Sequence, residues 1–563
     1  MSATVTSNIA SHLAVMAERQ PDRPAVLFPA RRDAQGLHYT QYTFRELDTM
    51  SSQMARGFER IGIRRGTRAA LLVPPSLDFF ALTFALFKVG AVPVLIDPGI
   101  GLDNFANCLA EAEPRAFIGI SKAQAARVLL GWGPSITISV TVGTRWFWGG
   151  HTLAQVQKLE TAEGNFTPAV PTPQETAAIL FTSGSTGAPK GVVYTHEIFT
   201  AQVEHIRALY GIQPGEIDLP TFPLFALFGP ALGMAAVIPE MDPTRPAQVD
   251  PVKLIEAIQR FGVTNMFGSP AVINRLGRHG EAHGVKLPTL RRAISAGAPV
   301  PAKALARFAA MLPPGAQVFT PYGATECLPV ASIGSDEILG ETRTQTDLGK
   351  GVCVGRPVPG LTVKIIRITD EAIAAWCDDL ELPRGEIGEI AVQAPHATRS
   401  YFNRPAATAQ AKLPAADGKF FHRMGDVGYL DERGRIWFCG RKSHRVVTKA
   451  GTLFTIPYEA IFNTHPAVFR SALVGVPISG GGLQGGDCKS PAREPVICIE
   501  SEANARTQDE AKLREELLAL AAKFPHTRGI RTVLFHPAFP VDIRHNAKIF
   551  RERLAVWAAE QLA

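Results

Sequence analysis

The chain has 563 residues, of which 46% are hydrophobic and 19% are charged, and its 58 Lys and Arg against 51 Asp and Glu give a formal net charge of +7. This composition excludes a mainly disordered or collagen-like chain, and the length allows several domains of ~150 residues each. The basic residues form no long run, so we expect an anionic substrate and no nucleic-acid partner.

The N-terminal segment and the cysteines indicate a cytoplasmic protein. Residues 1–24 lack a charged stretch followed by a continuous apolar run, so we predict a short amphipathic helix there and no secretory signal. The seven cysteines are an odd number and form no C-x-x-C pair, which favours reduced thiols.

Short apolar runs alternate with helical patterns over most of the first 440 residues, which is typical of an α/β fold whose parallel strands are joined by crossover helices. Residues 68–75 and 92–97 are predicted strands, and residues 77–89 are a predicted helix between them. The alternation recurs over residues 263–311. Predicted strands and turns from about residue 360 indicate a smaller β-rich unit.

The C-terminal block after residue 441 combines strands with an amphipathic helix. In residues 507–524 the apolar side chains Leu513, Leu517 and Ala521 share one helical stripe, so we predict that this helix covers a small sheet. The glycine-rich residues 479–487 have the composition of a mobile surface loop.

Residues 219–239 carry no charge and are about long enough to cross a bilayer. Four prolines and two glycines interrupt them, and acidic rather than basic residues flank them. We therefore predict a buried pair of helices that lines an apolar gorge, with a membrane span as the alternative.

The sharpest local signal is FTSGSTGAPKGVVYTH at residues 181–196, where an apolar strand enters a loop rich in glycine and hydroxyl groups. Backbone N–H groups, hydroxyls and a lysine together suit a polyphosphate. The loop is not a Walker A motif, because Pro189 stands where a glycine is required. A flexible Gly/Ser turn is the alternative. The phosphate-binding prediction comprises Thr182, Ser183, Gly184, Ser185, Thr186, Gly187 and Lys190.

This loop resembles the phosphate loop of the adenylate-forming superfamily, which contains acyl-CoA synthetases, luciferases and peptide-synthetase adenylation domains. Further segments are similar to the family's motifs in the same order. These segments are FKVGAVPVLIDP at 87–98, SAGAP at 295–299, YGATE at 322–326, RMGDVGYLDERGRIWFCGR at 423–441 and HNAKIFRERL at 545–554.

The resemblance implies a large N-terminal domain over residues 1–441, built from two α/β subdomains and a β-rich subdomain. It also implies a small α+β domain over residues 442–563 that rotates about a hinge near Ser443, so that one site serves two half-reactions.

The resemblance further implies ATP and Mg²⁺ as cofactors and assigns roles to individual residues. Thr325 would bind the α-phosphate, Glu326 would help hold Mg²⁺, and Lys548 would lie between the substrate carboxylate and the α-phosphate. Asp426 and Arg441 would bind the ribose. The adenine side would be formed by Gly297, Ala298, Pro299, Tyr322 and Gly323.

Several positions depart from a typical acyl-CoA synthetase. Ser443 stands at the hinge, Ala547 replaces a glycine, and residues 393–403 lack two glycines. Ala226 stands where the family usually has histidine or another ring. The loss of this ring is expected to open space for a branch at the α-carbon of the substrate. The alternative is that Phe225 and Phe228 fill the gap.

The apolar residues 219–239, Ala226 and the altered hinge at residues 443–445 together resemble the β-lactone synthetase branch of bacterial long-chain olefin biosynthesis. That resemblance implies activation of a long-chain 2-alkyl-3-hydroxyalkanoic acid as its acyl adenylate, after which the 3-hydroxyl displaces AMP and closes a β-lactone. It also implies assembly with a β-lactone decarboxylase and an NADPH-dependent reductase. His196 is the candidate base, with a packing role as the alternative.

Three other functions compete with this hypothesis. A long-chain acyl-CoA ligase or acyl-AMP ligase would share the ATP site, and the CoA ligase would also need an acceptor thiol. A catalytically silent binding protein is disfavoured because Glu326, Asp426, Arg441 and Lys548 are all present. A membrane-embedded protein is the third alternative.

Overall fold

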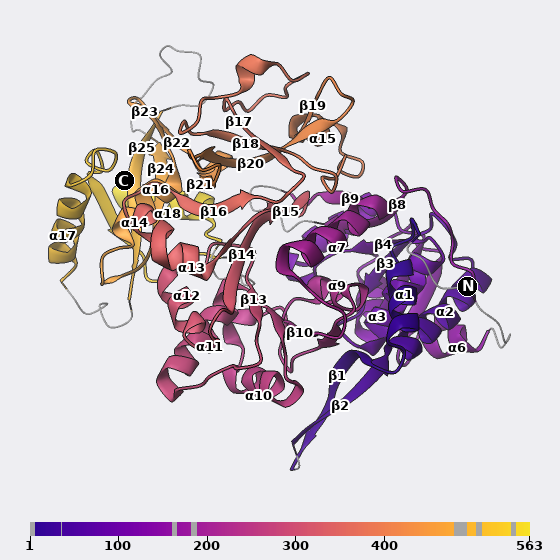
Figure 1. The fold of residues 1–563 in the computed structure, drawn as a ribbon. Coiled ribbons are helices and arrows are strands. Elements are labelled where there is room, and N and C mark those ends of the chain that lie inside the picture. Colours follow the sequence, from indigo (N-terminus) through magenta and orange to yellow (C-terminus); the bar gives the residue numbers. More distant parts are fainter. Residues whose placement is uncertain are drawn as a thin grey trace.

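The computed structural model of the chain describes residues 6–34, 36–159, 166–181, 188–477, 492–502, 509–541 and 548–563. Two large sheets dominate the N-terminal part, and a small three-stranded sheet lies in the C-terminal part (Figure 1). The predicted α/β class is confirmed.

The first large sheet has seven strands in the order β7-β6-β5-β3-β4-β8-β9, all parallel to their neighbours except β9, which runs antiparallel to β8. Its strands are β3 (Arg68–Leu72), β4 (Val92–Leu95), β5 (Ala116–Ile120), β6 (Ile138–Val142), β7 (His151–Thr152), β8 (Thr176–Phe181) and β9 (Gly191–Thr195). The helices between and around them are α1 (Ser11–Arg19), α2 (Phe44–Arg60), α3 (Leu77–Lys88), α4 (Leu102–Ala112), α5 (Ser121–Leu129), α6 (Leu153–Lys158) and α7 (His196–Tyr210).

The second large sheet has 14 strands and joins a parallel half to the antiparallel, β-rich half. Its strands are β1 (Pro24–Asp33), β2 (Gly36–Thr43), β10 (Ile217–Pro220), β11 (Ala235–Val237), β12 (Asn265–Phe267), β13 (Arg292–Ile294), β14 (Gln317–Ala324), β15 (Cys327–Gly334), β16 (Val352–Pro357), β17 (Thr362–Ile366), β18 (Gly388–Gln393), β19 (Lys412–Pro414), β20 (Phe420–Leu430) and β21 (Ile436–Arg441). Its helices are α8 (Pro223–Ala226), α9 (Phe228–Leu232), α10 (Pro251–Phe261), α11 (Pro270–His283), α12 (Ala302–Ala309), α13 (Ser335–Glu337), α14 (Arg343–Asp347) and α15 (Pro405–Ala411).

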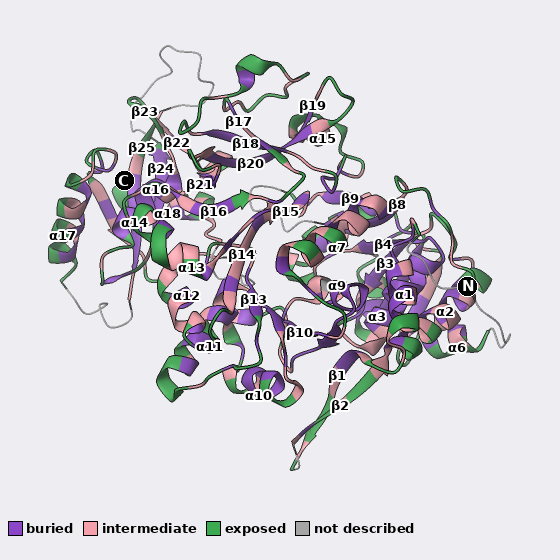
Figure 2. Ribbon diagram, viewed as in Figure 1, coloured by how far each residue is buried: buried purple, intermediate pink, exposed green. Residues whose placement is uncertain are grey.

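After Arg441 the strands leave the large sheets. A two-stranded sheet pairs β22 (Val446–Thr448) with β23 (Gly451–Leu453), and a three-stranded sheet contains β24 (Val468–Pro477), β25 (Arg493–Ser501) and β26 (Thr532–Phe535). Helices α16 (Thr455–Phe462), α17 (Glu510–Ala522) and α18 (Arg551–Leu562) accompany them. The predicted stripe on α17 is confirmed, because Leu513, Leu517 and Ala521 are buried while the opposite side is exposed (Figure 2). The glycine-rich residues 479–487 lie outside the described residues.

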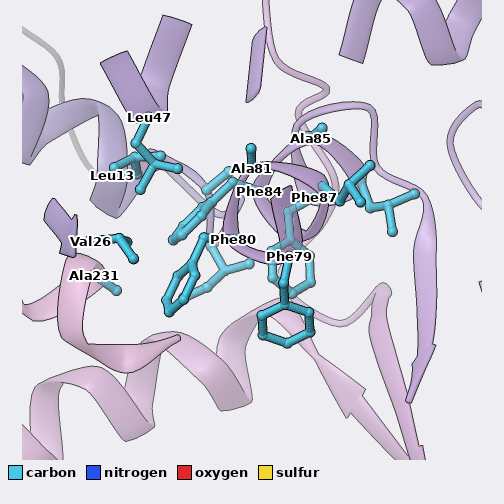
Figure 3. Packing of buried hydrophobic residues seen from close by; sticks show 14 of the residues in the cluster. Leu13, Val26, Leu47, Phe79, Phe80, Ala81, Phe84, Ala85, Phe87 and Ala231 are labelled. Carbon is cyan, nitrogen blue, oxygen red and sulfur yellow. The ribbon is translucent and has the colours of Figure 1, made fainter. Parts of the chain in front are cut away.

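Helix α3 forms the centre of the largest hydrophobic core, and every residue from Phe79 to Lys88 is buried (Figure 3). The Ser76 side chain caps its N-terminus by accepting the Phe79 N–H. At its C-terminus the buried Lys88 Nζ donates to the Asp48 carbonyl, the Asp48 carboxylate and Ser52 Oγ, at 2.7, 2.8 and 2.7 Å. All three ammonium protons therefore have acceptors, which makes burial of this charge tolerable.

Residues 219–239 form β10, α8, α9 and β11 and not one long helix. Within the described residues, no helix is long and apolar enough to cross a bilayer. The predicted pair of helices is present, with α9 buried and α8 half-buried, and the alternative of a helical membrane span at this segment is wrong.

Candidate active site

A single cavity of about 1460 Å³ is lined by both large sheets and by residues of the C-terminal block. Its apolar arm is formed by α3, α7, α8 and α9, and its polar part by the β14–β15 turn, β20, β21 and the segment before α18. The apolar arm includes Phe79, Phe84, Phe87, Phe199, Val203, Phe222, Phe225, Phe228 and Ala231. A cavity with these two parts suits a molecule that joins a polar group to a hydrocarbon chain.

Asp426 and Arg441 form a buried ion pair in the polar part. They face each other across β20 and β21, and Arg441 Nη1 lies 2.9 Å from Asp426 Oδ1. The Tyr322 hydroxyl donates to Asp426 Oδ2 at 2.8 Å. Burial raises the pKa of the Asp426 carboxyl, and the Arg441 charge opposes that shift. A fixed carboxylate of this kind can accept hydrogen bonds from neighbouring hydroxyls of a ligand.

Glu326 lies at the turn between β14 and β15, where Tyr401 orients its carboxylate. The Tyr401 hydroxyl donates to Glu326 Oε1 at 2.6 Å, and the Thr398 N–H donates to the Glu326 carbonyl at 2.8 Å. Tyr401 itself is only 7% exposed. This places one carboxylate at the cavity wall in a defined orientation.

Two lysines flank the ring of Tyr401. Lys190 Nζ lies 5.0 Å and Lys412 Nζ lies 5.9 Å from the ring centroid. Burial lowers the pKa of Lys412 to about 8, against the attraction of Glu326. Lys190, Tyr401 and Glu326 therefore form one group at the cavity wall, with the lysine over the face of the ring and the carboxylate at its hydroxyl.

Lys548 lines the same cavity although it lies more than 100 residues after Arg441 in the chain. Burial raises the pKa of the Asp426 carboxyl, and the positive charge of Lys548, like that of Arg441, opposes this rise. Helix α18 begins three residues later, and its Arg551 forms a buried ion pair with Glu459, with Arg551 Nη2 at 2.9 Å from Glu459 Oε2. The C-terminal block thus presents a lysine to a cavity built mainly by the N-terminal part.

The residues predicted for the adenine side also line this cavity. Gly297, Ala298 and Pro299 follow β13, and Gly323 lies in β14 beside Tyr322. A Cβ atom on Gly323 would lie 2.6 Å from the Cys327 carbonyl oxygen, so only glycine fits there. Thr325 is fixed by its carbonyl, which accepts the Tyr194 hydroxyl.

The structure does not bring every predicted residue to the cavity. Residues 182–187 lie outside the described residues, so the structure does not test their predicted role. His196 is 1% exposed and does not line the cavity; its Nδ1 accepts the Ile9 N–H at 3.3 Å, and burial lowers its pKa to about 4. His196 therefore has the packing role that was its alternative.

Ala226 also lies away from the cavity. It is 1% exposed in the core, whereas Phe222, Phe225 and Phe228 line the cavity around it. The expectation that Ala226 opens space for an α-branch is therefore wrong, and the neighbouring rings shape this wall instead.

Three residues of the site were missed by sequence analysis: Gln202, Tyr401 and Lys412. Tyr401 lies in the segment 393–403, where the two missing glycines were the only feature that the sequence singled out. Gln202 and Lys412 stand singly in ordinary helix and strand patterns, so no local signal distinguishes them.

Among the described residues, no group of three or more His, Cys, Asp or Glu side chains could hold a metal ion. Mg²⁺ in nucleotide sites needs only one or two carboxylates, because phosphates and water supply the remaining oxygen ligands. The carboxylate of Glu326, which Tyr401 orients at the wall of this cavity, fits such an ion.

Comparison with known proteins agrees with this geometry. Residues 13–402 match the family described as AMP-binding enzyme. The chain is 51% identical to the olefin beta-lactone synthetase of Xanthomonas campestris, over 99% of this chain and 98% of that protein. It is also 51% identical to the protein of the same name from Stenotrophomonas maltophilia, with the same coverage.

The amide bond synthetase McbA of Marinactinospora thermotolerans shares the fold, with a TM-score of 0.78 and 23% identity over 98% of this chain and 99% of that chain. The family match covers most of the chain. The chain belongs to the AMP-binding enzyme family and is an ATP-dependent adenylate-forming enzyme.

Proposed function

We propose that this enzyme converts a long-chain 2-alkyl-3-hydroxyalkanoic acid into a β-lactone through an acyl-AMP intermediate, with release of AMP and pyrophosphate. The observation that carries the proposal is the continuity of one cavity, in which a phenylalanine-rich arm meets Glu326, Asp426 and Lys548. The 51% identity to two proteins named olefin beta-lactone synthetase supports the choice of substrate.

In the first half-reaction, a carboxylate oxygen of the acid attacks the α-phosphorus of ATP and pyrophosphate leaves. Lys548 offsets the repulsion between the two anions and stabilises the negative charge on the α-phosphate oxygens in the transition state. Asp426 accepts hydrogen bonds from the ribose hydroxyls, and Lys190 binds the outgoing phosphates together with residues 182–187. Mg²⁺ held by Glu326 would neutralise pyrophosphate charge.

In the second half-reaction, the 3-hydroxyl oxygen attacks the acyl carbon. The new C–O bond closes the four-membered ring, the bond from the acyl carbon to the AMP oxygen breaks, and the hydroxyl proton passes to the departing phosphate. Because nucleophile and acyl phosphate belong to one bound molecule, the attack is unimolecular and gains a high effective molarity. A domain of residues 442–563, turning about Ser443, would withdraw Lys548 after adenylation.

The experiment incubates the purified protein with Mg-ATP and a 2-alkyl-3-hydroxy fatty acid in the absence of CoA and any other thiol. NMR identifies the products. We expect AMP, pyrophosphate and a β-lactone in equal amounts. Accumulated acyl adenylate that CoA then converts to a thioester would instead establish a long-chain acyl-CoA ligase.

A further inference from the structure

A loop at the edge of the seven-stranded sheet exposes two adjacent aromatic side chains. The loop joins β6 to β7, the last strand of that sheet, and its Trp146 and Phe147 are 53% and 65% exposed. Phe469 in β24 is the only other phenylalanine or tryptophan that is exposed in the described part of the chain. Single exposed apolar residues are ordinary, whereas neighbouring exposed rings indicate a contact with another molecule.

A buried tryptophan holds the two exposed rings in place. Trp148 Nε1 donates to Thr141 Oγ1 in β6 at 2.9 Å. The rings of Trp146 and Phe147 pack against the Trp148 ring, with centroid distances of 5.4 and 5.0 Å. The fold therefore presents the rings in fixed positions, and a preorganised loop loses little conformational entropy when it contacts another surface.

The chain around this loop carries positive charge only. β5, α5, β6, β7 and α6 all lie within residues 114–158, which contain five Lys and Arg and no Asp or Glu, although the whole chain has 51 acidic residues. Arg145 is exposed directly before the two rings, and Lys122 is exposed in the first turn of α5. Basic side chains beside exposed rings suit the anionic head groups of a lipid surface, where tryptophan lies at the boundary between head groups and hydrocarbon.

The loop also lies beside one end of the cavity. The Ser121 hydroxyl donates to the Thr144 carbonyl, and Ser121 stands between Ile120 and Ala123, which both line the cavity. Other cavity-lining residues at this end follow β3 and β4. Because β3, β4, β5 and β6 run parallel, this end of the cavity borders the same edge of the sheet from which the loop extends. An acid that leaves a lipid surface at this loop would have a short path to the cavity.

We infer that the loop of residues 143–150 is a docking site for an anionic lipid surface, from which the enzyme takes up its poorly water-soluble substrate. The uptake of substrate rests on the proposed function, because it takes a long-chain acid as the substrate. The contact is peripheral: Trp146 and Phe147 enter the head-group region, and Lys122 and Arg145 pair with lipid phosphates. Rings and charges act together, since each alone gives only weak attachment.

The test sediments the purified enzyme with vesicles in the absence of ATP and acid. One set of vesicles is phosphatidylcholine alone, and the other contains about one third phosphatidylglycerol. We expect the wild type to bind the anionic vesicles about tenfold more tightly than the neutral ones, and added salt should weaken this binding. Equal binding to both sets, or binding to neither, would overturn the inference.

Three variants assign the binding to the loop. Replacing both rings by Trp146→Ser and Phe147→Ser should weaken binding to anionic vesicles by about tenfold or more. Lys122→Glu reverses one charge and should weaken it by about tenfold. The matched control is Phe469→Ser, which removes an exposed ring from β24 and should bind as the wild type does. Wild-type binding by the double variant would overturn the inference.

A rate measurement separates docking from damage to the active site. Pyrophosphate release is measured with the long-chain acid held in anionic vesicles and with the same acid dissolved by cyclodextrin. The double variant Trp146→Ser/Phe147→Ser should be about tenfold slower than the wild type with the vesicles and equal to it with cyclodextrin. Equal losses under both conditions would overturn the inference.

Contact between copies of the chain is the competing use of the loop. Sedimentation velocity of the enzyme alone tests it: self-association that the double variant abolishes, without binding to vesicles, would overturn the inference. Lactone formation is measured separately. A lactone without docking refutes only the role of the loop, and docking without a lactone refutes only the proposed function.

Discussion

Replacing Tyr401 with phenylalanine removes one oxygen atom and one hydrogen bond from the cavity wall. The lost bond is the 2.6 Å contact to Glu326 Oε1, while the ring between Lys190 and Lys412 remains. A hydrogen bond to a charged group contributes ~1.5–3 kcal/mol, and solvent screens it little because Tyr401 is 7% exposed. The lower value corresponds to about a tenfold change in rate or binding. The lower value applies here because Glu326 lies at the wall of a cavity that is large enough to admit water.

The assay measures pyrophosphate release over a range of Mg-ATP concentrations at saturating acid. We expect kcat/KM for Mg-ATP to fall about tenfold in Tyr401→Phe, since a freely rotating carboxylate holds the metal less well. The control is Tyr210→Phe, which removes a buried hydroxyl 3.2 Å from Ser332 Oγ, outside the cavity. A Tyr401→Phe enzyme as efficient as the control would show that Glu326 needs no orientation by Tyr401.

Other substitutions test the remaining assignments. Lys548→Ala should lower adenylate formation by about 10²–10³ while calorimetry still detects ATP binding, and wild-type pyrophosphate release from it would refute the assignment. Ala226→His should lower the free energy of unfolding by about 1–3 kcal/mol through overpacking and affect branched and straight-chain acids equally; a loss confined to branched acids would contradict its place in the core. Burial lowers the pKa of His196 to about 4, whereas the unfolded chain has the ordinary value of about 6.5. Between these pH values the unfolded chain therefore binds a proton that the folded chain does not bind. The free energy of unfolding should fall as the pH drops through this window, by about 2 kcal/mol at pH 5. His196→Gln should show a shallower acid loss in urea titrations, and an unchanged slope would count against this account.

The sequence allowed the periodic elements to be predicted well. The helix predicted at 77–89 is α3, and the strands predicted at 68–75 and 92–97 contain β3 and β4. These elements follow from local patterns of apolar residues and from their caps, which a single chain displays directly. The order of motifs likewise indicated that Glu326, Asp426 and Lys548 would share a site, and all three line one cavity.

Side-chain direction was the part that the sequence did not determine. Ala226 was placed at the cavity because its neighbours resemble a motif, yet the short helix α8 turns Phe225 to the cavity and Ala226 to the core. Gln202 is a second residue whose place in the site the sequence did not reveal. Its Nε2 donates to the Leu328 carbonyl of β15 at 2.9 Å, and such a contact between distant segments leaves no trace in local spacing.

The two sides of helix α3 have different surroundings. Phe79, Thr83 and Phe87 follow one another at intervals of four residues and line the cavity, whereas Phe80 and Leu82 pack only into the core. Lys88 fastens the end of the helix to α2. Because Phe79 and Phe87 also belong to the buried core, a substitution on the cavity side changes both the space in the cavity and the packing of the helix. The shape of the cavity and the stability of the large N-terminal part are therefore coupled through this one helix.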